Sequence, residues 1–118
     1  MTELDFSSNR LQAVRPPREL AVAALGNDAA SVSDDLMTKL SSFTYFVGPS
    51  KRSGYVAFSR ELSLAIGHAA TPRDAFKNCL LSTHKELKTR IDRGERLPRE
   101  GDVNARFELV KRSLTAQR

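Results

Sequence analysis

The chain has 118 residues, with 19 lysines and arginines against 14 aspartates and glutamates, so its net charge is +5 at neutral pH. A hydrophobic fraction of 40% is too high for a wholly disordered chain, and the length suits one domain. The longest apolar run, Leu20 to Leu25, is far shorter than the roughly 20 residues of a membrane-spanning helix. We therefore expect one globular domain that does not cross a membrane.

The single cysteine, Cys79, excludes an internal disulfide and a zinc site built on cysteine pairs. The first residues, MTELDFSSNR, are acidic and polar and lack the apolar core of a signal peptide. Both features favour a reducing, cytoplasmic setting.

The positive charge is unevenly distributed along the chain. Residues 1–70 hold seven basic and seven acidic side chains, whereas residues 71–118 hold twelve basic and seven acidic ones. Such asymmetry is typical of a surface for nucleic acid or for an acidic protein, and also of the solvated faces of long helices.

In the N-terminal part, residues 1–15 show no sustained periodicity and predict a flexible arm. After two prolines, residues 19–25 predict a short helix that ends at Gly26. Ser31 and Asp34 then resemble a capping box. The helix that they would open has one apolar stripe, made by Val32, Leu36, Leu40 and Phe43.

Residues 43–58 predict an antiparallel β-hairpin. Two β-branched and aromatic runs flank a turn-rich stretch, GPSKRSG, which places two basic residues at the tip. Residues 60–69 fit a third strand or a helix, and we favour the helix.

The clearest element is a long helix over residues 72–93. Thr71 is a typical N-cap, Pro72 suits the first helical position, and Gly94 ends the helix. Its apolar face consists of Phe76, Cys79, Leu80, Thr83, Leu87 and Ile91.

A last amphipathic helix is predicted over residues 103–116, with Asp102 as its cap. Its seam of Val103, Phe107, Val110 and Leu114 suits either a contact with another chain or docking on its own core.

Together these elements predict an α+β fold. A mostly helical domain over residues 16–118 carries one hairpin and follows the arm. A two-stranded sheet covers little apolar surface, so the helical stripes favour a homodimer or a protein partner.

The sequence offers no convincing catalytic or metal site. His68 and His84 have no histidine at a metal-binding spacing, and on a helix Cys79 and His84 would point well apart. We therefore expect no enzyme activity, no metal and no cofactor.

Three resemblances point to regulators. Residues 54–87, GYVAFSRELSLAIGHAATPRDAFKNCLLSTHKEL, resemble the strand–helix–helix order of ribbon–helix–helix DNA-binding proteins. The expected strand has no Arg, Lys, Asn or Gln to read bases, so a DNA-binding repressor is an alternative that we favour less.

Residues 43–101 resemble HicB-family antitoxins, which bind and mask a small toxin without catalysis. The matching features are the hairpin, TPRDAFKNC at the start of the long helix, and GERLP after it. SRELS stands where the family has a Pro-Asp-Leu-Pro-Gly turn.

The whole chain is similar in size and arrangement to QslA-type quorum-sensing anti-activators. This resemblance implies a small cytoplasmic homodimer that binds a LuxR-type transcription activator and stops it from dimerising or reaching DNA.

We therefore expect a non-enzymatic regulator that neutralises another protein. The predicted apolar anchors for the dimer or the target are Leu80, Leu87, Phe107, Val110 and Leu114. The predicted steering charges at the rim are Arg90, Arg93 and Arg106.

Overall fold

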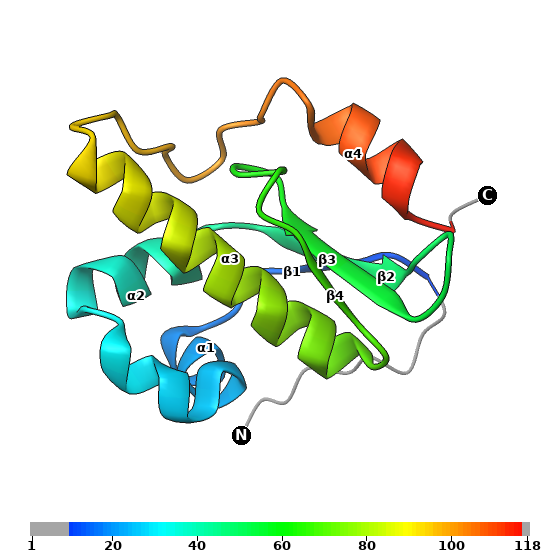
Figure 1. Ribbon diagram of the computed structural model, residues 1–118, viewed down its shortest axis with the longest axis horizontal. Helices are drawn as coiled ribbons and strands as arrows, with labels where there is room; N and C mark the ends of the chain where they lie inside the picture. The colour runs from blue at the N-terminus through cyan, green and yellow to red at the C-terminus, as the bar shows by residue number, and fades with distance from the viewer. Residues whose placement is uncertain (1–9, 117–118) are drawn as a thin grey trace.

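The computed structural model describes residues 10–116, which form a four-stranded antiparallel sheet with helices on both faces (Figure 1). The fold class is therefore α+β, as predicted. In chain order the elements are β1 (Gln12–Val14), α1 (Arg18–Leu25), the 3-10 helix η1 (Gly26–Ser31), α2 (Asp34–Ser42), β2 (Tyr45–Pro49), β3 (Tyr55–Ser59), β4 (Gly67–Ala69), α3 (Pro72–Asp92) and α4 (Phe107–Leu114). None of these helices combines the length and apolar character needed to cross a bilayer.

The predicted hairpin is present as β2 and β3, which pair from Tyr45 opposite Ser59 to Pro49 opposite Tyr55. Its tip closes where the Ser50 N–H donates to the Gly54 carbonyl at 3.0 Å. Gly54 has a φ of 70°, which residues with side chains rarely adopt.

The prediction of a helix over residues 60–69 is wrong. Residues 67–69 form strand β4 along β3, and the residues before them form a loop. Gly67 explains the difference, because its missing side chain lets β4 lie directly on the backbone of α3. The ribbon–helix–helix order is therefore absent. Strand β3 also has both edges occupied within one chain, so it cannot pair across a dimer.

The prediction of a flexible arm over residues 1–15 is wrong at its end, because residues 12–14 form the edge strand β1 against β2. Residues 1–9 lie outside the described part of the chain. Beyond β1, the same edge of β2 pairs with the chain after α4. There Lys51 N–H donates to the Leu114 carbonyl, and Ala116 N–H donates to the Pro49 carbonyl, each at 2.9 Å.

One predicted helix end and one predicted helix start are confirmed, and two other predicted starts are wrong. Helix α1 ends at Gly26, and Thr71 caps α3 by accepting the Asp74 N–H at 3.2 Å. Helix α2 is capped by Ser33 rather than Ser31, because Ser31 belongs to η1. Helix α4 begins at Phe107 rather than residue 103, since Asp102 instead accepts the Arg99 N–H within the preceding loop.

The main core lies between one face of the sheet and the helices α1, α2 and α3. The strands alternate, so that Tyr45, Val47 and Ala57 face this core. The Tyr45 ring packs edge-on against Phe76 of α3, with their centroids 5.4 Å apart. Most of the apolar stripes of α2 and α3 is thus buried within one chain, while Ile91 near the end of α3 is 49% exposed.

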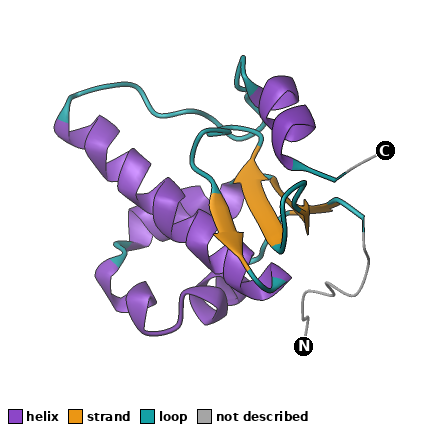
Figure 2. Cartoon of the chain, turned by 45° about the vertical axis from the view of Figure 1, so that its right-hand side comes forward, coloured by secondary structure: helices purple, strands orange, loops and turns teal. Residues whose placement is uncertain are grey.

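Helix α4 covers the opposite face of the sheet. Phe107 packs against Phe46 and Phe58, with ring centroids 5.1 Å and 6.0 Å apart respectively, and Val110 joins them. In Figure 2 the strands separate α4 from the other helices. Because the sheet has four strands and helices on both sides, most of the predicted stripes is covered without a second chain, and Val103 of the α4 seam stays 61% exposed ahead of the helix.

Candidate functional site

A groove of about 370 Å³ opens between α3 and the loop formed by residues 60–66. One wall is apolar and comes from the loop, and the other is polar and comes from α3. The lining residues are Leu62, Leu64, Ala65, Ile66, Ser82, Lys85, Glu86, Thr89, Arg90 and Asn104.

The conformation of the loop leaves a leucine in solvent. Ser59 Oγ accepts the Leu62 N–H at 2.9 Å, and the Ala65 N–H donates to the Leu62 carbonyl at 3.0 Å. This tight turn buries Leu62 and Ala65, while Leu64 between them is 65% exposed. Among the described residues, no other large apolar side chain is more exposed, which marks Leu64 as a candidate contact.

Side chains of α3 hold the loop and the β4 edge in place. Cys79 Sγ donates to the Ala65 carbonyl at 3.4 Å, and Ser82 Oγ donates to the Ile66 carbonyl at 3.3 Å. Asn78 Nδ2 donates to the His68 carbonyl at 2.9 Å. The bond to His68 satisfies a carbonyl of the edge strand β4, and the other two hold the preceding loop against α3.

A buried carboxylate supports the loop from beneath. Glu61 is only 2% exposed, and its oxygens accept the Thr44 N–H at 3.1 Å and the Gly101 N–H at 3.0 Å. Next to it, the Asn104 N–H donates to the Arg60 carbonyl at 2.9 Å. Glu61 thereby ties the start of β2 and the chain before α4 to the groove.

The α3 wall carries a net positive charge. Arg90 Nε donates to Glu86 Oε2 at 2.9 Å, which neutralises that pair. Lys85 is exposed and forms no ion pair within residues 10–116. The groove therefore offers an apolar lip beside one uncompensated ammonium group, an arrangement that suits an apolar side chain flanked by a carboxylate.

The structure changes the role of most predicted contact residues. Leu80 and Leu87 are fully buried in the main core, so they cannot anchor a partner. The α4 seam of Phe107, Val110 and Leu114 packs on the sheet of its own chain. The prediction that these three residues anchor a partner is therefore wrong as well.

The three predicted arginines do not gather at one place. Arg90 lines the groove, Arg93 pairs with Glu95 at 3.8 Å, and Arg106 is exposed before α4. Sequence reasoning missed Leu64 and Lys85. The alternation of Leu62, Leu64 and Ile66 was a signal for an extended segment. A second set, Leu62, Ala65, Ile66 and Ala69, fitted a helical face equally well.

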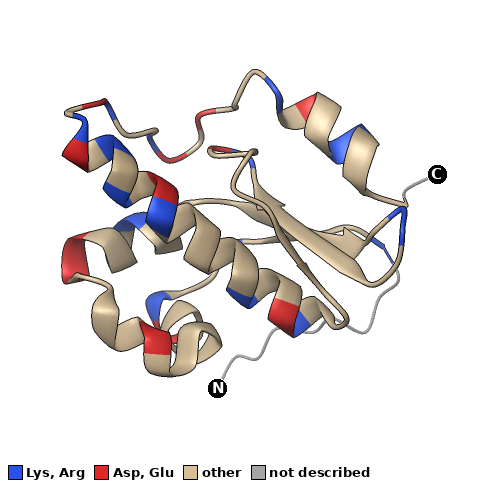
Figure 3. Ribbon diagram, in the orientation of Figure 1, with Lys and Arg blue, Asp and Glu red and all other residues tan. Residues whose placement is uncertain are grey.

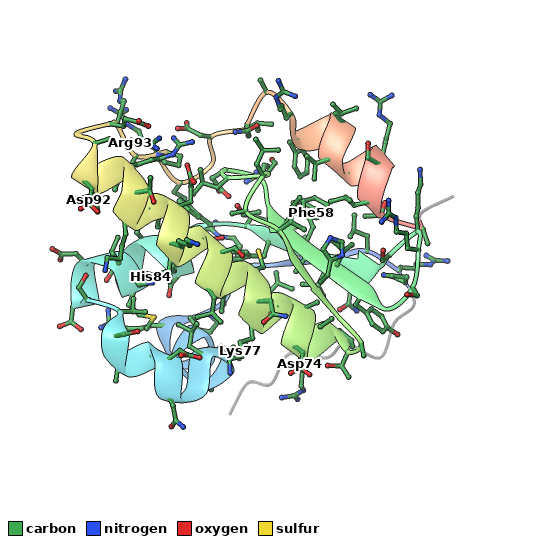
Figure 4. All side chains as sticks on the ribbon, in the orientation of Figure 1. Phe58, Asp74, Lys77, His84, Asp92 and Arg93 are labelled. Atoms are coloured by element: carbon green, nitrogen blue, oxygen red, sulfur yellow. The ribbon has the colours of Figure 1, made fainter. Side chains whose placement is uncertain are left out.

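The titratable side chains of α3 do not converge on a reactive centre. Burial raises the pKa of Cys79 to about 12, so its thiol stays protonated. Asp74, Lys77, His84, Asp92 and Arg93 are spread along the helix (Figure 4). Within residues 10–116, no three His, Cys, Asp or Glu side chains are placed to hold a metal ion.

Acid is expected to destabilise the protein through His84. Burial and, second, the charge of Lys88 lower its pKa from 6.5, and Nε2 has no hydrogen-bond partner among the described residues. The fold thus favours neutral His84, while the unfolded chain takes up a proton below about pH 6.5. The urea concentration at the unfolding midpoint should therefore decrease when the pH is lowered from about 7.5 to about 5.5. The decrease should be smaller in His84→Gln.

The matched control is His68→Gln, which removes an exposed imidazole from β4. It should keep the pH dependence of the wild type. An identical acid shift in wild type and His84→Gln would show that His84 is not the group responsible.

Comparisons of the chain with protein-family models, with curated proteins and with solved structures found no match. The geometry of the groove is therefore the basis for a functional proposal.

Proposed function

We propose that this chain is a non-enzymatic regulator that binds and neutralises another protein, using the groove between α3 and residues 60–66. One observation carries the proposal: Leu64 stands exposed at the groove's apolar lip, opposite the uncompensated charge of Lys85. Binding surfaces for proteins combine a central apolar anchor with charges at the rim, and the groove supplies both.

The resemblance to QslA-type anti-activators makes a LuxR-type transcription activator the first candidate target. In this proposal the regulator acts in the cytoplasm and occupies a surface that the activator needs to dimerise or to bind DNA. The proposal does not depend on a homodimer, because most of both predicted apolar faces is covered within one chain, with only Ile91 and Val103 of these faces left exposed.

A HicB-like antitoxin is the second candidate function. The observation that favours it is the adjacency of the β2–β3 hairpin and the long helix α3, the two features on which the resemblance rests. Both candidates predict a protein target at the same groove, so one pair of variants tests them together.

Leu64→Glu is expected to abolish capture of the target. A leucine at the centre of a contact contributes about 2 kcal/mol, so the affinity should fall by roughly 30-fold. The measurement compares binding of the wild type and the variant to the purified ligand-binding domain of the host's LuxR-type activator, and to proteins captured from host lysate. Leu64 is exposed, so the stability should change by less than about 0.5 kcal/mol.

Leu109→Glu is the matched control, because Leu109 is 51% exposed and lies on α4, away from the residues that line the groove. It should retain the target. A target that Leu64→Glu retains, or that both variants lose equally, would contradict the assignment of the groove.

A further inference from the structure

One end of the molecule carries basic side chains almost exclusively (Figure 3). Arg10 lies just before β1, Lys51 and Arg52 form the hairpin tip, and Lys111 and Arg112 lie in the last turn of α4. Residues 10–14, 45–59 and 109–116, which form this end, contain no aspartate or glutamate. We call these five side chains the basic end.

Backbone pairing brings the basic end together. The hairpin tip is joined to the chain after α4 by the Lys51 N–H, which donates to the Leu114 carbonyl at 2.9 Å, and by a bridge between Ser50 and Thr115. On the same edge of β2, Gln12 pairs with Val47, which places the start of β1 nearby. Three segments far apart in the sequence thus contribute charge to one surface.

Most of this charge has no internal partner. Lys51 and Arg52 are exposed and form no ion pair within residues 10–116. Arg112 is exposed, and its Nε donates to the Glu108 carbonyl rather than to a carboxylate. Lys111 approaches an acid, Glu108, at 4.0 Å, and its ammonium lies 5.7 Å from the centre of the Phe107 ring.

We infer that the basic end binds the phosphate backbone of nucleic acid without reading the base sequence. The tip from Ser50 to Gly54 reads Ser-Lys-Arg-Ser-Gly and offers ammonium, guanidinium and hydroxyl groups, which contact phosphates. It has no apolar side chain to anchor a protein partner, which favours a polyanion over an acidic protein. The tip also has no Asn or Gln for base recognition, so contacts should be independent of sequence.

The strength of binding follows from the number of charges. About three to four phosphate contacts would give a slope near −3 in a plot of log affinity against log salt concentration. Dissociation constants of non-specific complexes of this kind lie between roughly 1 and 100 μM at physiological salt.

The test is the fluorescence anisotropy of a labelled DNA duplex of about 20 base pairs of arbitrary sequence, titrated at about 50 and 200 mM salt. The double variant Lys51→Glu/Arg52→Glu should bind at least about tenfold more weakly, with a slope reduced by about 2. An RNA duplex of the same length, measured in parallel, shows which backbone is preferred. Binding to either one supports the inference.

Arg96→Glu/Arg99→Glu is the matched control. It changes the net charge by the same amount, and residues 96 and 99 are exposed in the chain between α3 and α4, away from the hairpin tip. It should weaken binding by less than about threefold. Equal losses in the two double variants, or no salt-dependent binding by the wild type, would overturn the inference.

All four substituted side chains are exposed, so the thermal unfolding of both variants should match the wild type. If Lys51→Glu/Arg52→Glu has a lower melting temperature than the wild type, Arg112→Glu replaces it in the test. Arg112→Glu should likewise bind the duplex more weakly than the wild type.

Discussion

Gly67→Ala should destabilise the protein by about 3 kcal/mol or more, which lowers the melting temperature by roughly 10 °C or more. A Cβ at Gly67 would lie under 3.0 Å from the carbonyl oxygen of Ala75 and the amide nitrogen of Cys79. Both are backbone atoms of α3, so no side-chain rotation relieves the clash, and β4 must move away from the helix. Urea and thermal unfolding measure the loss.

Gly94→Ala is the matched control for this prediction. Gly94 has a φ of 69° and no atom within 4 Å of its added Cβ, so alanine there costs only backbone strain of about 1 kcal/mol. Gly67→Ala measures the cost of a steric clash with α3, whereas Gly94→Ala measures the cost of a positive φ alone. Equal losses at the two positions would show that β4 does not need the close approach to α3.

Glu61→Gln is expected to cost about 2 kcal/mol of unfolding free energy. The Thr44 N–H donates to both carboxylate oxygens, at 3.1 and 3.3 Å, and the Gly101 N–H donates to one of them at 3.0 Å. An amide at this position therefore turns its NH2 group towards at least one backbone N–H in either orientation, and a buried donor then faces a donor. Hydrogen exchange of these two amides should accelerate along with the global loss, because Glu61 ties the two chain segments to the groove.

Glu19→Gln makes the same chemical change on the exposed surface of α1 and should alter stability by less than about 0.5 kcal/mol. Unchanged protection of both the Thr44 and the Gly101 amides in Glu61→Gln would contradict the proposed role of the carboxylate. The shape of the groove depends on the same carboxylate, so target binding should weaken in Glu61→Gln as well.

Local signals predicted the elements that local chemistry controls. Thr71 and Pro72 fix the start of α3 by capping and by proline geometry, and these effects act within one helical turn. The β2–β3 hairpin likewise follows from two short β-forming runs and a turn between them.

Long-range contacts determine the elements that the sequence did not predict. Strands β1 and β4 have three residues each, too few for a periodic signal, and exist because β2 and β3 offer them edges. Helix α4 begins later than predicted because Asp102, the expected cap, instead accepts the Arg99 N–H and closes a turn.

The candidate site shows the same limit. An apolar stripe predicts that a helix face is buried, but it does not tell which surface covers it. Leu87 and Phe107 were correctly recognised as parts of apolar faces, yet their own chain covers them. Leu64 was overlooked as a contact because only the turn around it reveals that it points into solvent.

The lone cysteine of the main core has a practical consequence. Cys79 is completely buried, and its thiol has a pKa of about 12, so thiol reagents should modify it only when the chain opens. The rate of alkylation of the unaltered protein therefore reports how often α3 separates from β4. No label, tag or engineered residue is needed, and the alkylation rate of Cys79 can be compared between the wild type and each variant.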